Sequence, residues 1–149
     1  MYANILLSTD GSDVARTGIK QGLALAKALN AKVTVITVTE PLPPAVGADA
    51  LAWIPSKAEI DSFDSANKER AGKVLDEAQA MARQIGTSAE LLHVPNAHPA
   101  TAIIETANSR GCDLIVMASH GRRGLRKLLL GSQTSEVLAD GSVPVLVMR

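Results

Sequence analysis

The strongest chemical signal in the sequence is the glycine-containing segment Ala118–Ser132. Gly121 and Gly131 carry no side chain, so the backbone there can approach a ligand where a Cβ atom would clash. A helix is predicted to start just after Gly131, and its free N–H groups and positive dipole end suit a phosphate. Ser132 and Thr134 add hydroxyl donors at this point. The alternative interpretation is a plain turn in which Ser132 only caps the helix.

A second polar segment, Ser8–Ser12, follows the first apolar run of the chain. Asp10 places a carboxylate where the first strand is predicted to end, and Gly11 permits a sharp turn. Asp10 therefore either contributes to a ligand site or satisfies the backbone of its own loop, while Ser12 or Asp13 can cap the following helix. The sequence contains neither GxxxxGK[ST] nor GxGxxG after the first strand, so the common phosphate motifs are missing.

Basic side chains cluster within the glycine-containing segment, at Arg122, Arg123, Arg126 and Lys127. They form a solvated loop face, or one of them, Arg122 or Arg126, neutralises phosphate charge. A nucleic-acid surface is the least favoured interpretation, because the 15 basic and 15 acidic residues balance and aromatic residues make up only 2% of the chain. No nucleic-acid partner is expected.

Histidine and cysteine residues give no catalytic or metal signature. His120 follows Ser119 directly, but a nucleophile needs a base within reach and a third group that orients it, and no GxSxG motif is present. His93, His98 and His120 lack the close spacing of a metal site. Cys112 is the only cysteine and is expected to be a buried packing residue. We predict no catalytic residue and no metal site.

Short β-branched runs alternate with longer helical patterns along the whole chain. Strands are predicted at Asn4–Ser8, Lys32–Val38, Glu90–Val94, Leu114–Ala118 and Val145–Met148, and helices at Asp13–Asn30, Ser62–Ile85, Pro99–Ser109 and Gln133–Ala139. This alternation predicts one doubly wound, Rossmann-like α/β domain over residues 1–149, with four helices and a five-stranded, mostly parallel sheet. Such folds have a crevice beside the carboxyl end of the first strand. The order of the strands stays open.

One connection, Thr39–Asp61, is long for a compact domain and contains four of the seven prolines. It is either a mobile surface excursion or a lid or partner contact that uses Trp53. The remaining composition suggests a cytoplasmic protein, because one cysteine cannot form an intrachain disulfide. There is also no leader-like segment and no run of about 18 apolar residues, so no membrane contact is expected.

Taken together, the motifs resemble those of the universal stress protein family over nearly the whole length. The segments that carry the resemblance are Ile5–Ser12, Asp113–Arg122, Leu129–Ser132 and Pro144–Val147. Nucleotide-binding members of that family carry G-x2-G-x9-G-[ST]. Here Gly121, nine intervening residues, Gly131 and Ser132 match, whereas Ala118 stands at the first position and adds one methyl group.

The resemblance implies an ATP site, or one for a related adenine nucleotide, with Mg²⁺ between the phosphates. The implied base and ribose pocket contains Thr9, Asp10, Val38 and Met117, although Val38 and Met117 are also typical core residues. The implied phosphate side contains Gly121, Gly131, Ser132 and Thr134, and the binding set also includes Ala118, Arg122 and Gln133. In the family, edge strands pair in homodimers, which here implicates Val145, Leu146 and Val147.

The function implied by the resemblance is a nucleotide-binding regulator of the stress response that acts as a homodimer and is not primarily an enzyme. Two alternatives stay open. One is a slow ATPase or phosphoryl-transfer protein that uses Asp10, the only carboxylate placed near the site. The other is a dimeric interaction module that binds no nucleotide. Cyclic AMP in place of ATP is a variant of the first hypothesis.

Overall fold

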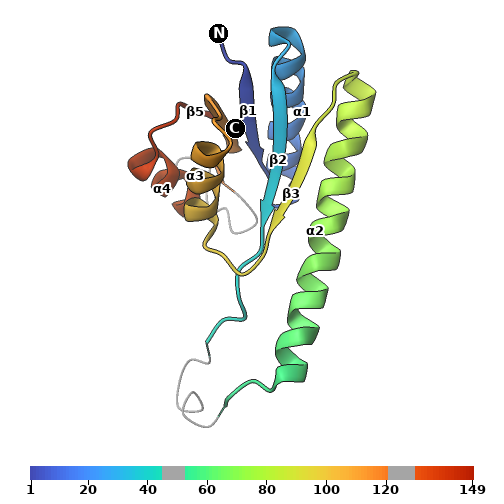
Figure 1. Cartoon of the computed structure of the whole chain (residues 1–149), viewed down its shortest axis with the longest axis vertical. Coiled ribbons are helices and arrows are strands. Elements are labelled where there is room, and N and C mark those ends of the chain that lie inside the picture. Colours follow the sequence, from blue (N-terminus) through green and yellow to red (C-terminus); the bar gives the residue numbers. More distant parts are fainter. Residues whose placement is uncertain (45–52, 121–129) are drawn as a thin grey trace.

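The structure is a computed structural model, which describes residues 1–44, 53–120 and 130–149. Its elements are β1 (Asn4–Ser8), α1 (Asp13–Leu29), β2 (Lys32–Val38), α2 (Lys57–Ile85), β3 (Glu90–Val94), α3 (Pro99–Ser109), β4 (Leu114–Ala118), α4 (Ser132–Asp140) and β5 (Val145–Met148). All five strands have the predicted bounds. The predicted α/β fold with four helices and a five-stranded sheet is therefore confirmed (Figure 1).

The strands form one parallel sheet in the order β3-β2-β1-β4-β5. This order, which the sequence left open, makes β1 the central strand and puts β5 at an edge. The chain builds the sheet outward from β1 on one side through β2 and β3, and on the other side through β4 and β5. The order therefore reverses between β1 and β4.

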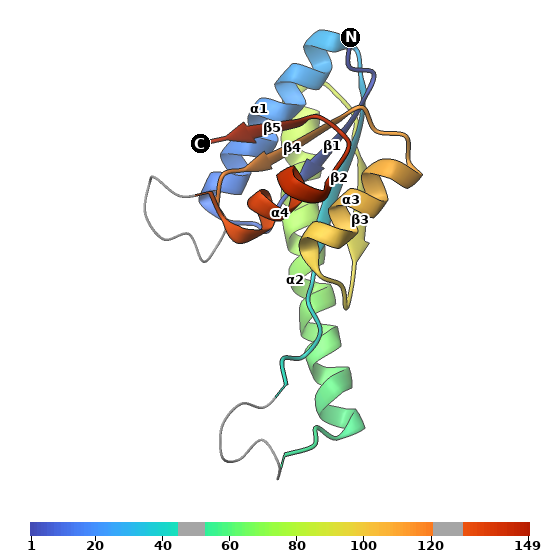
Figure 2. The same cartoon turned by 90° about the vertical axis from the view of Figure 1, so that its left-hand side faces the viewer.

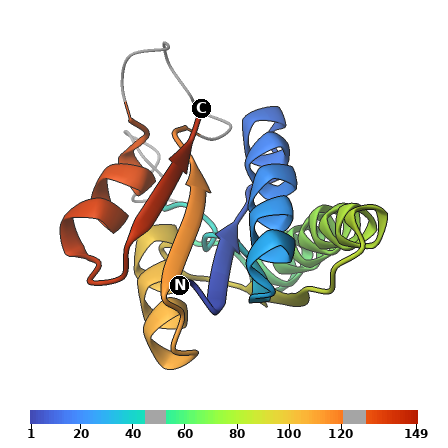
Figure 3. The same cartoon turned by 90° about the horizontal axis from the view of Figure 1, so that it is seen from above.

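Helices cover both faces of the sheet, with α1 and α2 on one face and α3 and α4 on the other (Figure 3). Because successive strand residues point to opposite faces, Ile5 and Leu7 join the core on the α1–α2 face, and Leu6 joins the core on the α3–α4 face. All three are fully buried. Burial on both faces explains why the central strands read as continuous apolar runs. Within the described residues, no helix is both long and apolar enough to cross a membrane.

The helix ends follow local capping signals; the start of α2 differs from the prediction by five residues, and the end of α1 and both ends of α4 differ from it by one residue. α2 begins at Lys57 and not at Ser62, because Ser56 and Glu59 form a reciprocal capping box. α4 begins at Ser132 and is capped by Gly131, so Ser132 is not the cap that one interpretation assigned to it.

The buried residues of α2 are Asn67, Ala71, Leu75, Ala78 and Ala82. The apolar spacing in the sequence predicts one face with Phe63, Ala66, Val74, Ala78, Met81 and Ile85 on or near it. Of these, Ala78 is buried and Met81 and Ile85 pack against the core, whereas Phe63 is half-buried and Ala66 is exposed. The reason is length: α2 has 29 residues against 17 in α1, and its first half projects beyond the carboxyl edge of the sheet (Figures 1 and 2).

The amino edge of the sheet is closed by side chains that bind backbone groups. Asp113 accepts hydrogen bonds from the N–H groups of Ala3 and Asn4, at 2.8 and 3.0 Å. Asn4 in turn donates through Nδ2 to the carbonyl of Arg110 at 2.8 Å. Asp113 directly precedes β4 and its donors lie at the start of β1, so the carboxylate ties β1 to β4.

Candidate functional site

The candidate site lies at the carboxyl edge of the sheet, where β1 and β4 end side by side. The two strands pair in parallel, with Leu7 opposite Val116. Because the strand order reverses here, this is the position at which open α/β sheets bind ligands. The two polar segments singled out in the sequence leave these two strands, so the fold brings together residues that are more than 100 positions apart.

The turn after β1 is held by its own side chains. Thr9 is buried, and its Oγ1 accepts a hydrogen bond from the Gly11 N–H at 3.1 Å. Asp10 Oδ1 accepts from the Ser12 N–H at 2.9 Å, and Ser12 Oγ accepts from the Ala15 N–H as the cap of α1. Gly11 has φ of 79°, which favours glycine. The loop role of Asp10 and the capping role of Ser12 are thus confirmed, while a ligand role for Asp10 stays a prediction.

The end of β4 is fastened to the start of α4 by two hydrogen bonds. The Gly131 N–H donates to the carbonyl of Ser119 at 2.6 Å. Thr134 Oγ1 donates to the carbonyl of Ala118 at 2.9 Å, and Thr134 is only 2% exposed. The hydroxyl hydrogen of Thr134 is therefore directed at β4, which gives this residue a positioning role. We name these two bonds the β4–α4 clasp.

Gly131 is required by close packing and not by its backbone angles. Its φ of −60° and ψ of 154° are open to any residue. A Cβ atom on Gly131, however, would lie 3.2 Å from the Cα of His120 and 3.3 Å from the carbonyl oxygen of Ser119. As the cap of α4 it also supplies no side chain to the first turn of the helix. The backbone of α4 therefore approaches the end of β4 closely and keeps its leading N–H groups free of a side-chain cap.

The two residues that follow Gly131 have different surroundings. Ser132 is the first residue of α4 and is exposed. Gln133 turns toward α3, where its Oε1 accepts a hydrogen bond from the Ala100 N–H at 2.8 Å. His98 Nε2 and Glu136 Oε2 lie 2.5 Å apart and join the same two helices. Gln133 was predicted as a binding residue; in this geometry it caps α3.

Val38 and Met117, predicted as walls of the base pocket, both contribute to the core on the α3–α4 face. Met117 is 6% exposed, and Val38 is half-buried against the same cluster. Both end parallel strands at the carboxyl edge, as the sequence indicates. Their packing role is established, and contact with a ligand stays a prediction.

The remaining predicted residues fall partly outside the structure. Gly121 and Arg122, as well as Arg123, Arg126 and Lys127, lie outside the described residues. His120 lies within the described residues and is half-buried, and the neighbouring Ser119 is buried. The Nδ1 atom of His120 lies 2.9 Å from the Oγ atom of Ser119, so these two adjacent side chains are hydrogen-bonded to each other.

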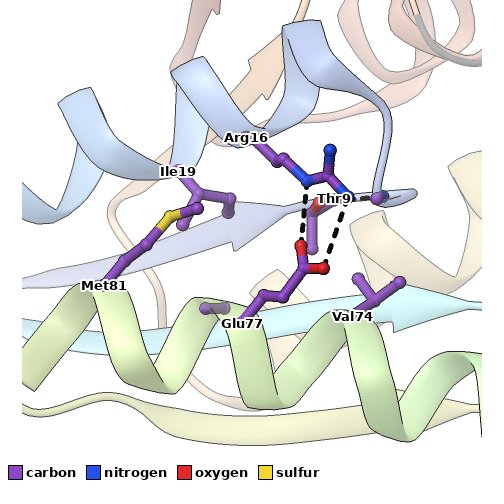
Figure 4. A pocket seen from close by; sticks show the side chains of 8 residues that line it. Thr9, Arg16, Ile19, Val74, Glu77 and Met81 are labelled. Atoms are coloured by element: carbon purple, nitrogen blue, oxygen red, sulfur yellow. Dashed lines mark hydrogen bonds and ion pairs between the residues drawn. The ribbon is translucent and has the colours of Figure 1, made fainter.

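Sequence reasoning missed a polar contact that lies next to Thr9. Arg16 of α1 binds Glu77 of α2 through Nε and Nη2, at 2.8 and 3.3 Å (Figure 4). Its Nη1 also binds Asp13 Oδ1 at 2.9 Å. The hydrogen bond to Glu77 is the main cause that raises the pKa of Arg16. Residues 61 positions apart carry no local signal for such a pair, so only the fold could disclose it. The contact joins the first turn of α1, which follows the turn that contains Asp10, to α2.

The pKa values of His93 and Cys112 are both shifted by burial. His93 accepts or donates a hydrogen bond at Nε2 with Thr39 Oγ1 at 2.8 Å, and burial, with a smaller contribution from Lys68, lowers its pKa. Among the described residues, no group of three His, Cys, Asp or Glu side chains could hold a metal ion. Cys112 is buried, as predicted, and burial raises the pKa of its thiol.

Comparison with known proteins agrees with this geometry. The model of the universal stress protein family matches residues 1–149. A universal stress protein of Thermus aquaticus is 36% identical over 152 residues, and the alignment covers the full length of both chains. Universal stress protein MJ0531 of Methanocaldococcus jannaschii is 32% identical over 149 residues, which is all of this chain and 83% of that protein.

Solved structures share the fold over almost the full length. Protein MJ0577 superposes with a TM-score of 0.78 at 26% identity, covering 99% of this chain and 96% of that chain. A universal stress protein in complex with cAMP has a TM-score of 0.74 at 24% identity and coverage of 99% and 97%. One from Archaeoglobus fulgidus in complex with dAMP has a TM-score of 0.68 at 17% identity and coverage of 99% and 98%.

Proposed function

Because this chain belongs to the universal stress protein family, we propose that it binds an adenine nucleotide, ATP in first place, and acts as a homodimeric regulator. The binding site is the carboxyl edge between β1 and β4. One observation carries the proposal: at the point where the strand order reverses, the uncapped start of α4 is held against the end of β4. Structural neighbours that bind cAMP and dAMP point to the same class of ligand.

The chemistry of the donors fits a phosphate group. An α-helix begins with N–H groups that have no partner within the helix and carries a partial positive charge there. In α4 the cap residue is Gly131, which offers no side chain to these groups, and Ser132 adds an exposed hydroxyl. Anions are stabilised at such a helix start, so the nucleotide's phosphates are proposed to lie against Gly131 and Ser132.

Mg²⁺ fits this arrangement as a partner of the phosphates. Protein sites hold Mg²⁺ by one or two carboxylates together with substrate phosphates and water. Asp10, in the turn after β1, supplies a carboxylate at this edge, and its Oδ1 also holds the Ser12 N–H. Bound Mg²⁺ would neutralise phosphate charge, while Asp10, Gly131 and Ser132 would orient the nucleotide.

The proposed homodimer forms through β5. This strand lies at the edge of the sheet, so its outer backbone groups are available for pairing with another strand. Leu146 is 37% exposed, which is unusual for a large apolar residue in a strand of this sheet. Pairing with the β5 of a second copy would satisfy the backbone and cover Leu146. The variant Leu146→Lys should weaken this association in sedimentation velocity.

Calorimetric titration tests nucleotide binding. The native chain is titrated with ATP, AMP, cAMP and GTP in the presence and absence of Mg²⁺, and ligand that is released on denaturation is identified by mass spectrometry. We expect saturable binding of at least one adenine nucleotide, and tighter ATP binding with Mg²⁺. Absence of saturable binding at millimolar ATP with Mg²⁺ would refute the proposal, whereas binding of GTP with equal affinity would refute the adenine specificity.

A further inference from the structure

The first half of α2 projects from the body of the molecule, beside the segment that follows β2 (Figures 1 and 2). Arg16 contacts Glu77, and Lys27 Nζ donates to the Ile85 carbonyl at 2.5 Å, so α1 and α2 run in the same direction. α1 starts at Asp13, three residues before Arg16. The part of α2 before Val74 therefore lies beyond the start of α1.

One face of α2 runs along its whole length and has different surroundings in its two halves. The residues of this face follow one another at intervals of three or four, which keeps them on one side of a helix: Glu59, Phe63, Ala66, Arg70, Val74, Glu77 and Met81. Val74, Glu77 and Met81 lie against Arg16 and Ile19 of α1. The part of the face with Glu59, Phe63, Ala66 and Arg70 continues past the end of α1. We name this part the projecting face.

An apolar groove of about 530 Å³ lies on the projecting face, between α2 and two residues of the preceding segment. It is lined by Leu42, Trp53, Ala58, Glu59, Ser62, Phe63 and Ala66. Trp53, which lines the groove, is 39% exposed, and its neighbour Ile54, which does not line it, is 88% exposed. An exposed apolar groove of this kind is typical of a protein–protein contact. Within the described residues, the groove faces outward.

The projecting face carries a negative charge, Glu59, near one end and a positive charge, Arg70, near the other, at equal distances from its midpoint. Glu59 lies five residues before Asp64, and Arg70 lies five residues after Ser65, so the midpoint of the face is between Asp64 and Ser65. A second α2 that packs antiparallel about a two-fold axis at this point brings Phe63 opposite Ala66. The same rotation brings Glu59 of each copy opposite Arg70 of the other. A two-fold contact requires this self-complementarity.

Local hydrogen bonds favour the charged form of Glu59. The Ser56 backbone N–H, first among several hydrogen bonds, lowers the pKa of Glu59. That bond uses Glu59 Oε2, at 2.7 Å, and the Trp53 side chain also hydrogen-bonds the carboxylate. The Ser56 hydroxyl accepts a hydrogen bond from the Glu59 backbone N–H. Arg70 is exposed and donates from Nη2 to Asn67 Oδ1 within its own helix. A guanidinium has five N–H donors, so the others can reach a carboxylate on a second chain.

We propose that the projecting face of α2, with Leu42 and Trp53, is an interface between two copies of this chain, in which the α2 helices pack antiparallel. Phe63 and Ala66 form its apolar centre, and two Glu59–Arg70 pairs form its ends. This interface lies on α2 and is separate from β5, so it adds an association step to any pairing through the sheet edge. It requires no bound nucleotide.

Charge exchange tests the interface. Sedimentation velocity is run over a wide range of concentration on the native chain, on Arg70→Glu, and on the double variant Glu59→Arg/Arg70→Glu. Arg70→Glu sets like charges against each other at both ends and should weaken this step at least about tenfold. The double variant restores opposite charges and should recover most of the lost association. Each measurement is repeated in the Leu146→Lys background, so that association through α2 can be distinguished from pairing through β5.

Matched controls separate the interface from helix stability and net charge. Lys68→Glu changes the net charge by the same amount as Arg70→Glu but lies on the opposite side of α2, so it should leave association unchanged. Glu59→Gln keeps a capping-box residue and removes the charge, so it should weaken association while circular dichroism shows an intact helix. Trp53 is the only tryptophan, and its emission should shift to shorter wavelength on association.

Three results would overturn the proposal: native chain that shows no association step in the Leu146→Lys background, equal effects of Arg70→Glu and Lys68→Glu, or a double variant that associates no better than Arg70→Glu. The last two would assign the groove to a different partner. Nucleotide titration of the same variants should give the native affinity. A loss of nucleotide binding in all samples, including the native chain, would concern the proposed function and not this interface.

Discussion

The two edges of the sheet use polar groups in different ways. At the amino edge, Asp113 binds the N–H groups of Ala3 and Asn4, and Asn4 binds the carbonyl of Arg110, so side chains close the gaps between strands and loops. At the carboxyl edge, the β4–α4 clasp holds the helix start in place through Gly131, while no side chain caps that start. Polar groups complete the fold at one edge and leave a set of donors available at the other.

This difference indicates what each edge can do. A polar group whose hydrogen bonds are all made within the protein contributes to stability, and its removal costs roughly the free energy of those hydrogen bonds. A positioned but uncapped helix start stabilises the fold less and binds an anion better. Changes at the carboxyl edge should therefore alter ligand binding, whereas changes at the amino edge should alter stability alone.

The largest effect is expected for Gly131→Val. The Cβ atom meets the backbone at His120 and Ser119, which cannot give way easily, so α4 must move from β4. Overpacking of this kind costs roughly 1–3 kcal/mol of stability. The displaced helix start should also lose nucleotide affinity, by more than about tenfold. Calorimetric titration and denaturant unfolding measure the two losses, and native affinity in Gly131→Val would contradict the role of the carboxyl edge.

A smaller effect at the same edge is expected for Thr134→Val. Valine keeps the shape of threonine but removes the hydroxyl that binds the Ala118 carbonyl, in a position that is 2% exposed. The unpaired carbonyl should cost about 1–2 kcal/mol of stability. Because the clasp positions α4, nucleotide affinity should fall as well.

Thr134→Ser is the control for this change. Serine retains the hydroxyl, so it should restore most of the affinity even where some stability is lost with the methyl group. Equal losses of affinity in the serine and valine variants would show that packing of the methyl group, and not the clasp, positions the helix.

The sequence predicted the secondary structure better than the contacts between helices. All five strands could be located because buried parallel strands are short apolar runs. The start of α2 could also have been found, since Ser56 and Glu59 form a standard capping-box pattern. The contact between Arg16 and Glu77, by contrast, depends on how two helices lie relative to each other, and no spacing in the chain reveals it.

The site residues divide in the same way. Gly131 was predicted to let the backbone approach a ligand, which stays a prediction; the structure shows instead that its backbone lies close to His120 and Ser119 of the same chain. The side chains of Thr134 and Gln133 bind Ala118 and Ala100, and these partners come from β4 and α3. Sequence motifs indicate which residues gather at a site, while side-chain direction depends on tertiary packing.

At the amino edge, Asp113→Ala should lower stability and leave nucleotide binding unchanged. Two backbone N–H groups lose their acceptor, which should cost about 1 kcal/mol at this partly solvated position. Hydrogen bonds from Ala3 come first among the causes that lower the pKa of Asp113. Its contribution is therefore present above the ordinary carboxyl pKa and is lost as the pH falls through the lower, folded-state pKa.

Denaturant unfolding of the native chain and of Asp113→Ala at neutral and acid pH measures this contribution, and the difference between the two should shrink in acid. A reduced nucleotide affinity in Asp113→Ala would contradict the division of labour between the edges, since the carboxylate lies at the far end of β4 from the clasp.

The smallest effect is expected from His93, which lies at the carboxyl edge but outside the clasp. Burial lowers its pKa in the folded state, so the unfolded chain takes up a proton first as the pH falls below the ordinary histidine value of about 6.5. Stability should therefore decrease from that pH down to the folded-state pKa and change no further for this group below it. His93→Gln removes the titrating group and can keep a hydrogen bond to Thr39, so its stability should depend less on pH across this window. Unfolding curves between neutral and mildly acid pH would measure the slope, and equal slopes in the two proteins would assign the pH dependence to other groups.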